Sequence, residues 1–152
     1  MRRTRRGVWA CVPVALMALA SGCAQLGPIR GREPIVRTLQ TTGYCACGDC
    51  CGWHRNWLFQ KVYSSGPRKG EPKKVGITAS GTQARRGTIA ADTSRYPFGT
   101  VMYIGDYGYG RVEDRGGAIK GDHIDLFFRT HGQALEWGKR TVPVKIWYPL
   151  RP

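Results

Sequence analysis

Residues 112–128 read VEDRGGAIKGDHIDLFF. This stretch is the most informative part of the sequence for the fold, and the patterns on either side of it agree with it. It joins two β-rich runs, 109–113 and 124–128, through a glycine-rich link. Asp125 interrupts the second run, IDLFF, which is otherwise apolar. A carboxylate in such a run either faces solvent by strand alternation or has a chemical role.

Four more short β-rich runs lie outward from this stretch and are separated by turn signals. They cover residues 38–44, 88–91, 100–104 and 141–148. Six short strands can close a small barrel, so we expect an all-β fold. One helical pattern, HGQALEWG, has Thr130 as its N-cap and Gly138 at the C′ position, and we expect it to plug or flank the barrel.

The first 22 residues are typical of a bacterial secretion signal, with the basic segment MRRTRR followed by an apolar segment over residues 7–20. The sequence LASGC ends at Cys23 and resembles the lipobox of bacterial lipoproteins, which predicts lipidation of Cys23. An ordinary secretory signal and an uncleaved anchor are the alternatives. Residues 23–37 then form a tether, and one domain covers residues 38–150.

The charge of the chain favours a polyanionic partner. There are 24 Lys and Arg against 10 Asp and Glu, and removal of the four arginines in the signal lowers the formal net charge from +14 to +10. An exported protein meets anionic glycans and membrane surfaces, and the sequence carries no nucleic-acid-binding signature. Six basic residues lie in the segment 53–75, which we expect to be a long surface loop that either holds an anionic substrate or is a solvated insertion.

Four cysteines of the domain fall within seven residues, at Cys45, Cys47, Cys50 and Cys51. In an oxidising compartment an even number of cysteines favours two disulfides. The four thiols can also bind a metal, although the adjacency of Cys50 and Cys51 strains a tetrahedral site of all four. The CxxC spacing of CGDC also fits redox chemistry, so three alternatives stay open.

Only ten carboxylates occur in the chain, so elimination narrows the catalytic candidates. Four are assigned to the tether, the basic segment, a hairpin turn and an exposed helix face, namely Glu33, Glu71, Asp106 and Glu136. The others are Asp92, Glu113, Asp114, Asp122 and Asp125, with Asp49 among the cysteines. Glu113 and Asp114 are adjacent at a strand end and cannot face the same way. Closing a turn is the alternative role for Asp92 and for Asp114.

From residue 76 the chain contains, in order, GITASGT, AADTSRYPFGT, VEDRGGAIKGDHIDLFF and THGQALEWGKRTVPVKIW. These four blocks resemble the three-aspartate (3D) domain, whose aspartates fall here on Asp92, Asp114 and Asp125. The run DRGGAIKGDHID also resembles the membrane-bound lytic transglycosylase A family, and GYCACGDCCGW is similar to the cysteine-rich lead-in of many 3D proteins. The segment 53–75 is longer than in that pattern, and Arg115 stands where the family often has a small polar residue.

The resemblance implies a six-stranded double-psi β-barrel and cleavage of peptidoglycan between N-acetylmuramic acid and N-acetylglucosamine. It implies Asp125 as the catalytic acid and base, with Asp114 and Asp92 beside it in the cleft. To hold a proton at neutral pH, Asp125 needs a raised pKa. Repulsion from a second carboxylate at roughly 4 Å, at an effective dielectric constant of about 20, costs about 4 kcal/mol and would raise the pKa of Asp125 by about three units. Desolvation by the apolar strand would raise it further.

The expected substrate-binding residues are Lys120, Gly117 and Thr78. Lys120 is also expected to be the positive charge opposite Asp125. The alternative for the glycine-rich run is that its residues only form a turn. His123 and His131 are expected to be surface groups. The expected partners are glycan strands and, through the lipid anchor, a membrane. We expect a monomer that requires no cofactor. A glycan-binding barrel without activity, a two-carboxylate hydrolase, and a metal or redox protein built on the cysteines are the alternatives.

Overall fold

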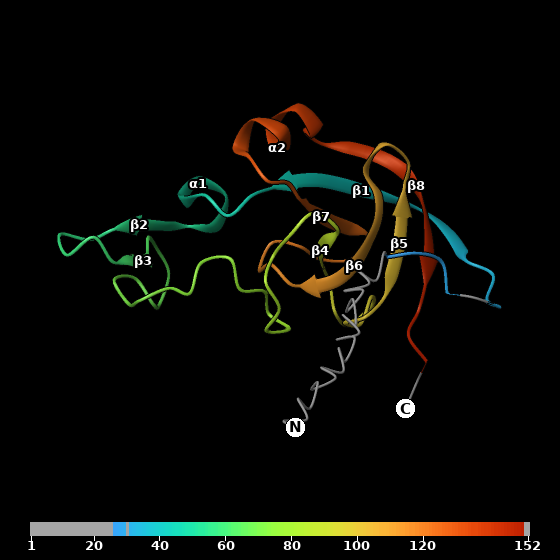
Figure 1. The fold of residues 1–152 in the computed structure, drawn as a ribbon, viewed down its shortest axis with the longest axis horizontal. Coiled ribbons are helices and arrows are strands. Elements are labelled where there is room, and N and C mark those ends of the chain that lie inside the picture. Colours follow the sequence, from blue (N-terminus) through green and yellow to red (C-terminus); the bar gives the residue numbers. More distant parts are fainter. Residues whose placement is uncertain (1–25, 30, 151–152) are drawn as a thin grey trace, which may run out of the picture.

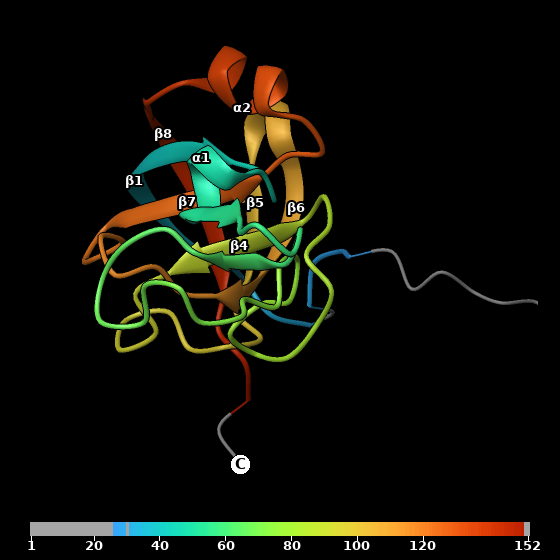
Figure 2. The same cartoon turned by 90° about the vertical axis from the view of Figure 1, so that its left-hand side faces the viewer.

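In the computed structural model, which describes residues 26–29 and 31–150, six strands close into a β-barrel (Figures 1 and 2). They are β1 (Ile35–Tyr44), β4 (Thr88–Ala91), β5 (Val101–Ile104), β6 (Gly108–Asp114), β7 (His123–Phe127) and β8 (Arg140–Trp147). Their order around the barrel is β1-β7-β4-β6-β5-β8. The pairs β1–β7 and β4–β6 are parallel and the other four are antiparallel. This closed mixed barrel confirms the expected six-stranded double-psi fold.

All six expected runs form barrel strands, and the largest difference is at β1. This strand begins at Ile35, which pairs with Ile146 of β8, so the last three residues of the expected tether belong to the barrel. The expected signal, residues 1–22, and the expected lipidation site Cys23 lie outside the described residues.

The barrel interior is filled by alternate positions of the strands. Leu39, Ile89, Ile124 and Leu126 are fully buried in one core cluster. The expected helix is α2 (His131–Trp137), which covers one end of the barrel in both views (Figures 1 and 2). Thr130 accepts a hydrogen bond from the backbone N–H of Gln133, as an N-cap should. The indole N–H of Trp137 donates to the hydroxyl of Thr41 at 3.1 Å and so holds α2 on β1.

A second, smaller cluster lies on the outer face of the barrel wall. It consists of Tyr44, Ala90 and Phe127, whose sequence neighbours Ile89 and Leu126 point inward, so strand alternation turns these three outward. Residues 45–52, here called the cysteine arm, follow β1 directly, contain the one-turn helix α1 (Gly48–Cys51), and pack on this cluster through Cys50 and Cys51.

The basic segment 53–75, which we expected to be a loop, contains a hairpin of β2 (Trp53–Arg55) and β3 (Lys61–Tyr63). The side-chain oxygen of Asn56 accepts from the backbone N–H groups of Leu58 and Gln60 and closes its turn. The hairpin projects sideways from the barrel (Figure 1). In the part of the chain that the structure describes, every helix is too short or too polar to span a bilayer.

Gly43 permits the close contact between β1 and α2, and replacing it tests that contact. A Cβ at Gly43 would lie 2.7 Å from the carbonyl oxygen of Ala134. We expect Gly43→Ala to lower the free energy of unfolding by about 1–3 kcal/mol, measured by urea denaturation. The matched control is Gly132→Ala in α2, where a Cβ meets nothing within 4 Å, and where alanine favours the helix. Equal stability of the two variants would contradict this packing.

Candidate active site

Two of the three family aspartates lie in one row across the outer face of the barrel. Ala90 of β4 is opposite Asp125 of β7 on one side and Asp114 of β6 on the other, and Thr42 of β1 is opposite Asp125. The row exists because the β4–β6 register shifts between Ile89 and Ala90, which skips Glu113. At about 4.8 Å per strand, the α carbons of the two aspartates are about 10 Å apart, with a methyl group between them.

These aspartates open on a cleft of about 470 Å³. The cysteine arm, the segment 73–79 and the loop 115–119 form its walls over the barrel strands. Side chains and backbone that line it include Tyr44, Cys51, Lys73, Lys74, Thr78 and Gly117. The cleft therefore combines two carboxylates with a rim that carries positive charge.

The environment of Asp125 raises the pKa of its carboxyl group. Burial is the largest cause; a hydrogen bond from the hydroxyl of Thr42 to Oδ1 at 2.9 Å and the charge of His123 oppose it, and Asp114 adds a smaller increase. The sequence predicted repulsion between carboxylates at roughly 4 Å as the main cause. The structure ranks these two causes of the raised pKa the other way round. Strand β4 separates Asp114 from Asp125, which weakens the repulsion, and the walls of the cleft remove water from Asp125.

Thr42 links Asp125 to a histidine. Its Oγ1 lies 2.9 Å from Nε2 of His123 and 2.9 Å from Oδ1 of Asp125. Because the single hydroxyl proton of Thr42 is donated to the carboxylate, Oγ1 accepts the second hydrogen bond from the N–H of His123. His123, which we expected to be a surface group, thus orients the residue that holds Asp125.

Asp114 fastens a loop to the cleft. Its Oδ1 accepts from the backbone N–H groups of Ala79 and Arg115, each at 2.9 Å, and its Oδ2 accepts from the hydroxyl of Tyr44 at 3.3 Å. Burial, followed by the charges of Asp114 and Asp125, raises the pKa of Tyr44, so its hydroxyl stays a donor. Glu113 points the other way and is buried, where it accepts from Thr88 at 2.9 Å.

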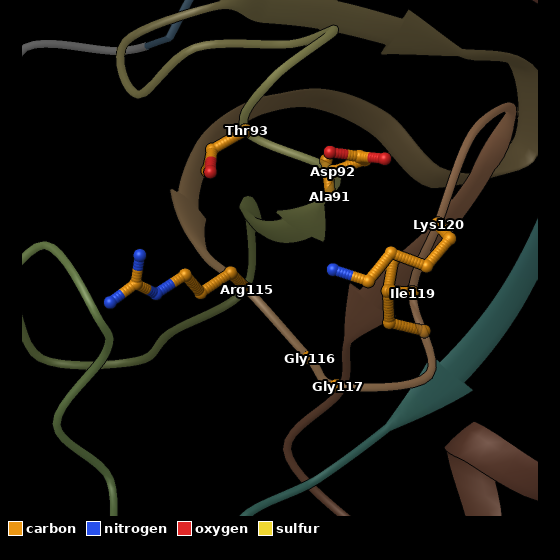
Figure 3. Close-up of a pocket in the computed structure, with 8 residues that line it drawn as sticks. All are labelled: Ala91, Asp92, Thr93, Arg115, Gly116, Gly117, Ile119 and Lys120. Carbon is orange, nitrogen blue, oxygen red and sulfur yellow. The ribbon is translucent and has the colours of Figure 1, made fainter.

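Asp92 lies in a neighbouring pocket of about 400 Å³ and not in the cleft of Asp125 (Figure 3). It accepts hydrogen bonds from the hydroxyl and backbone N–H of Ser94 and from the N–H of Gly121. These bonds lower the pKa of Asp92 to about 2, with a smaller contribution from Lys120. Lys120 extends its amine into this pocket, so the structure places it with Asp92 rather than opposite Asp125.

Gly117 and Gly116 line both pockets and form the boundary between them. Thr78 is buried, and its Oγ1 is hydrogen-bonded with the hydroxyls of Ser80 and Thr82, so this residue of the cleft wall also stabilises its own loop. Of the residues around Asp125, sequence reasoning missed Thr42 and Tyr44. The signal that finds them is the parallel pairing of β1 with β7, which no local pattern contains.

A family model matches the part of the chain that carries the three aspartates. Residues 87–148 match the family model of the 3D domain, and this range contains three of the four sequence blocks on which the resemblance rested. Asp92, Asp114 and Asp125 all fall within the matched range.

Two curated relatives come from Bacillus subtilis (strain 168). The chain is 39% identical over 75 residues to the cell wall-binding protein YocH and to the putative cell wall shaping protein YabE, which is 47% of this chain but 26% and 18% of theirs. The chain thus spans about a quarter or less of the relatives that it matches. Among solved structures, MltA from Escherichia coli aligns with a TM-score of 0.40 and 23% identity, over 52% of this chain and 30% of MltA.

Removing the hydroxyl of Thr42 tests its effect on Asp125. Because the hydrogen bond from Thr42 lowers the pKa of Asp125, we expect Thr42→Val to raise that pKa further. An NMR pH titration of the Asp125 carboxyl carbon measures it. Thr38→Val, at an exposed position on the same strand, should leave the titration unchanged. An unaltered midpoint in Thr42→Val would show that the bond does not tune Asp125.

The charge of Asp92 should stabilise the fold in a defined pH range. Because its folded pKa of about 2 lies below the unfolded value of about 3.9, the stabilisation is present above about pH 4 and is lost as the pH falls toward 2. We expect Asp92→Asn to have a lower Tm than the wild type at neutral pH, with the difference vanishing near pH 2. Asp106→Asn, at a highly exposed carboxylate, should follow the wild type. A pH-independent difference would argue against this linkage.

Proposed function

We propose that this chain cleaves peptidoglycan between N-acetylmuramic acid and N-acetylglucosamine as a lytic transglycosylase, with Asp125 as the catalytic acid and base. One observation carries the proposal. Asp125 is a partly buried carboxylate whose pKa is raised by burial, and it opens on a cleft large enough for a sugar-sized group. A carboxyl group in that environment keeps its proton to a higher pH than a solvated aspartate does, which favours its use as a general acid.

One carboxyl group suffices for this reaction. Asp125 in its acid form donates its proton to the glycosidic oxygen, and the bond from that oxygen to C1 of the muramic acid breaks. The resulting carboxylate then takes the proton of the C6 hydroxyl group, whose oxygen attacks C1 and closes a 1,6-anhydro ring. The substrate supplies the nucleophile, so the reaction consumes no water and requires no second catalytic carboxylate.

The neighbours of Asp125 have positioning roles in this proposal. Thr42 fixes the orientation of the carboxyl group through its hydrogen bond to Oδ1. Asp114 holds the loop at Ala79 against the cleft and presents a carboxylate across from Asp125, where positive charge develops on the sugar ring. Lys73 and Lys74 lie at the rim, where they suit the carboxylates of the lactyl and peptide groups of the wall.

The curated relatives support a role at the cell wall, because both names refer to it and the matched segment is 39% identical. That role implies a location outside the cytoplasm, and it agrees with the secretion signal in residues 1–22. We extend the proposal to a lipoprotein of the cell envelope anchored through Cys23, which acts as a monomer on glycan strands.

A barrel that binds glycan without cutting it is the second candidate, and the name of the relative that binds the cell wall favours it. Trp57 and Tyr107, two aromatic residues of a kind that stacks on sugars, do not lie on one face. Trp57 is 85% exposed at the tip of the β2–β3 hairpin, whereas Tyr107 is buried against Phe128 and Trp137 in the core. Such a module would rely on the basic rim of the cleft instead.

Digestion of purified cell walls tests the proposal directly. We expect the wild type to release soluble muropeptides and Asp125→Asn to lose about 10²–10⁴-fold of the rate, because the amide cannot donate the required proton. Asp106→Asn is the matched control and should keep full activity. Mass spectrometry should find 1,6-anhydro ends, which are one water lighter than reducing ends.

Other results would point to the alternatives. Reducing ends among the products would indicate a two-carboxylate hydrolase, in which Asp114→Asn would be as damaging as Asp125→Asn. Sedimentation of the protein with cell walls, without release of any muropeptide, would indicate the binding module.

A further inference from the structure

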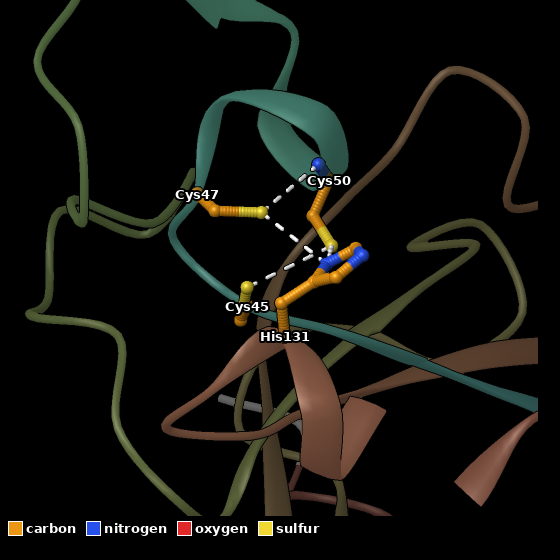
Figure 4. Close-up of side chains that lie close together, drawn as sticks. All are labelled: Cys45, Cys47, Cys50 and His131. Carbon is orange, nitrogen blue, oxygen red and sulfur yellow. Dashed lines mark hydrogen bonds between the residues drawn. The ribbon is translucent and has the colours of Figure 1, made fainter. Parts of the chain in front are cut away.

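Three cysteine thiols of the cysteine arm surround one ring nitrogen of His131 (Figure 4). The four ligand atoms of Cys45, Cys47, Cys50 and His131 all lie within 4.8 Å of one another. Cys47 and Cys50 come from the two ends of the α1 turn, Cys45 from the start of the arm, and the imidazole of His131 points up to them from α2 (Figure 4). The cluster contains one histidine and three cysteines, which is a common ligand set of structural zinc.

The spacing of the ligand atoms matches a tetrahedral zinc ion. Zn–S bonds of about 2.3 Å and Zn–N bonds of about 2.0–2.1 Å at tetrahedral angles place two sulfurs about 3.8 Å apart, and a sulfur and a nitrogen about 3.6 Å apart. The sulfurs of Cys45 and Cys50 are 3.7 Å apart. Nδ1 of His131 is 3.5 Å from the sulfur of Cys47 and 3.4 Å from that of Cys50. Three edges of the tetrahedron therefore have the length that zinc requires.

The barrel brings these ligands together from distant parts of the chain. Tyr44 and Phe127 are partners at the ends of the parallel strands β1 and β7, so both strands leave the barrel at the same edge. Cys45 follows the first strand directly, and His131 opens the helix that follows the second. The backbone N–H of Cys50 donates to the sulfur of Cys47 at 3.4 Å, a contact that stabilises a thiolate in a CxxC turn.

Cys51 is separate from the cluster, which removes the strain expected from four cysteines on one ion. Its thiol donates to the carbonyl oxygen of Cys45 at 3.1 Å, and its side chain lines the cleft of Asp125. The adjacent cysteines therefore make different sulfur contacts, Cys50 with Nδ1 of His131 and Cys51 with the carbonyl oxygen of Cys45. A disulfide between Cys45 and Cys50 would draw the sulfurs to about 2.0 Å and take two ligands out of the set.

We propose that Cys45, Cys47, Cys50 and His131 bind one Zn²⁺ ion in a closed structural site. Four protein ligands leave no open position, so the ion stabilises the fold rather than acting on a substrate. It joins the cysteine arm to α2, and the arm supplies Cys50 and Cys51 to the cleft wall. The site is independent of whether the cleft cuts glycan or only binds it.

Metal titration of the full chain tests the site. The purified protein is stripped with a chelator under reducing conditions and titrated with Co²⁺ and then Zn²⁺. We expect one Co²⁺ per chain, with the visible bands of tetrahedral cobalt and sulfur-to-cobalt charge transfer, and complete displacement by one Zn²⁺. Zinc should also raise the Tm, because the ion binds only the folded arrangement.

Variants distinguish the ligands from their neighbours. Cys47→Ser and His131→Ala should lose the cobalt bands, whereas the matched controls Cys51→Ser and His54→Ala should bind one ion as the wild type does. His131→Cys should restore binding with stronger charge transfer, because a fourth sulfur replaces the nitrogen, and this result excludes a simple loss of folding.

Some results would overturn the site. They are full Co²⁺ binding by both Cys47→Ser and His131→Ala, equal loss in Cys51→Ser, or failure of the folded, fully reduced wild type to bind. Protein isolated from the cell envelope with two disulfides and no metal would likewise refute it and favour the disulfide alternative.

Discussion

The parallel pairing of β1 with β7 is the constraint on which the rest of the structure depends. It runs from Gln40 opposite His123 to Tyr44 opposite Phe127 and closes the barrel, so neither strand is left as an edge. The same register places Thr42 beside Asp125. A shift of one residue would turn Asp125 into the apolar interior and Leu126 into the cleft. Fold and chemistry therefore share one set of backbone hydrogen bonds.

The pKa values of two family aspartates, Asp92 and Asp125, are shifted in opposite directions although the two residues lie on neighbouring strands or their ends. Asp92 accepts three hydrogen bonds that stabilise its charged form, and its low pKa keeps it a carboxylate. Asp125 is partly buried, and this burial raises its pKa. The difference arises from covering segments, because both residues sit on adjacent barrel strands or their ends. Desolvation, rather than repulsion between carboxylates, is the main cause of the raised pKa of Asp125, whereas hydrogen bonds are the main cause of the lowered pKa of Asp92.

Local patterns in the sequence were sufficient to predict the barrel. The β-rich runs, the glycine-rich links, and the capping residues Thr130 and Gly138 each act over a few residues, and the structure has all of them. The hairpin in the segment 53–75 was not predicted, because the polar turn at Asn56 closes through a side chain rather than through a glycine signal.

The contents of the site depended on contacts that local patterns do not contain. The irregular β4–β6 register exchanges Glu113 for Asp114 in the cleft, and no composition rule predicts such a shift. His131 meets Cys50 across 81 positions of sequence, and Thr42 meets Asp125 across 83. Predicting these pairs requires the strand order first. The sequence could therefore point to Asp125 as a candidate while missing the groups that hold it.

The large sequence separation between β1 and its partner strands also determines when the barrel can form. Its hydrogen-bonding partners on both sides, β7 and β8, lie in the last third of the chain. During synthesis β1 has no strand to pair with until β7 has been made, and contacts between such distant segments form slowly. The inward-facing side chains of β1, such as Leu39, therefore stay uncovered until the C-terminal strands are present, and the barrel can close only late in synthesis.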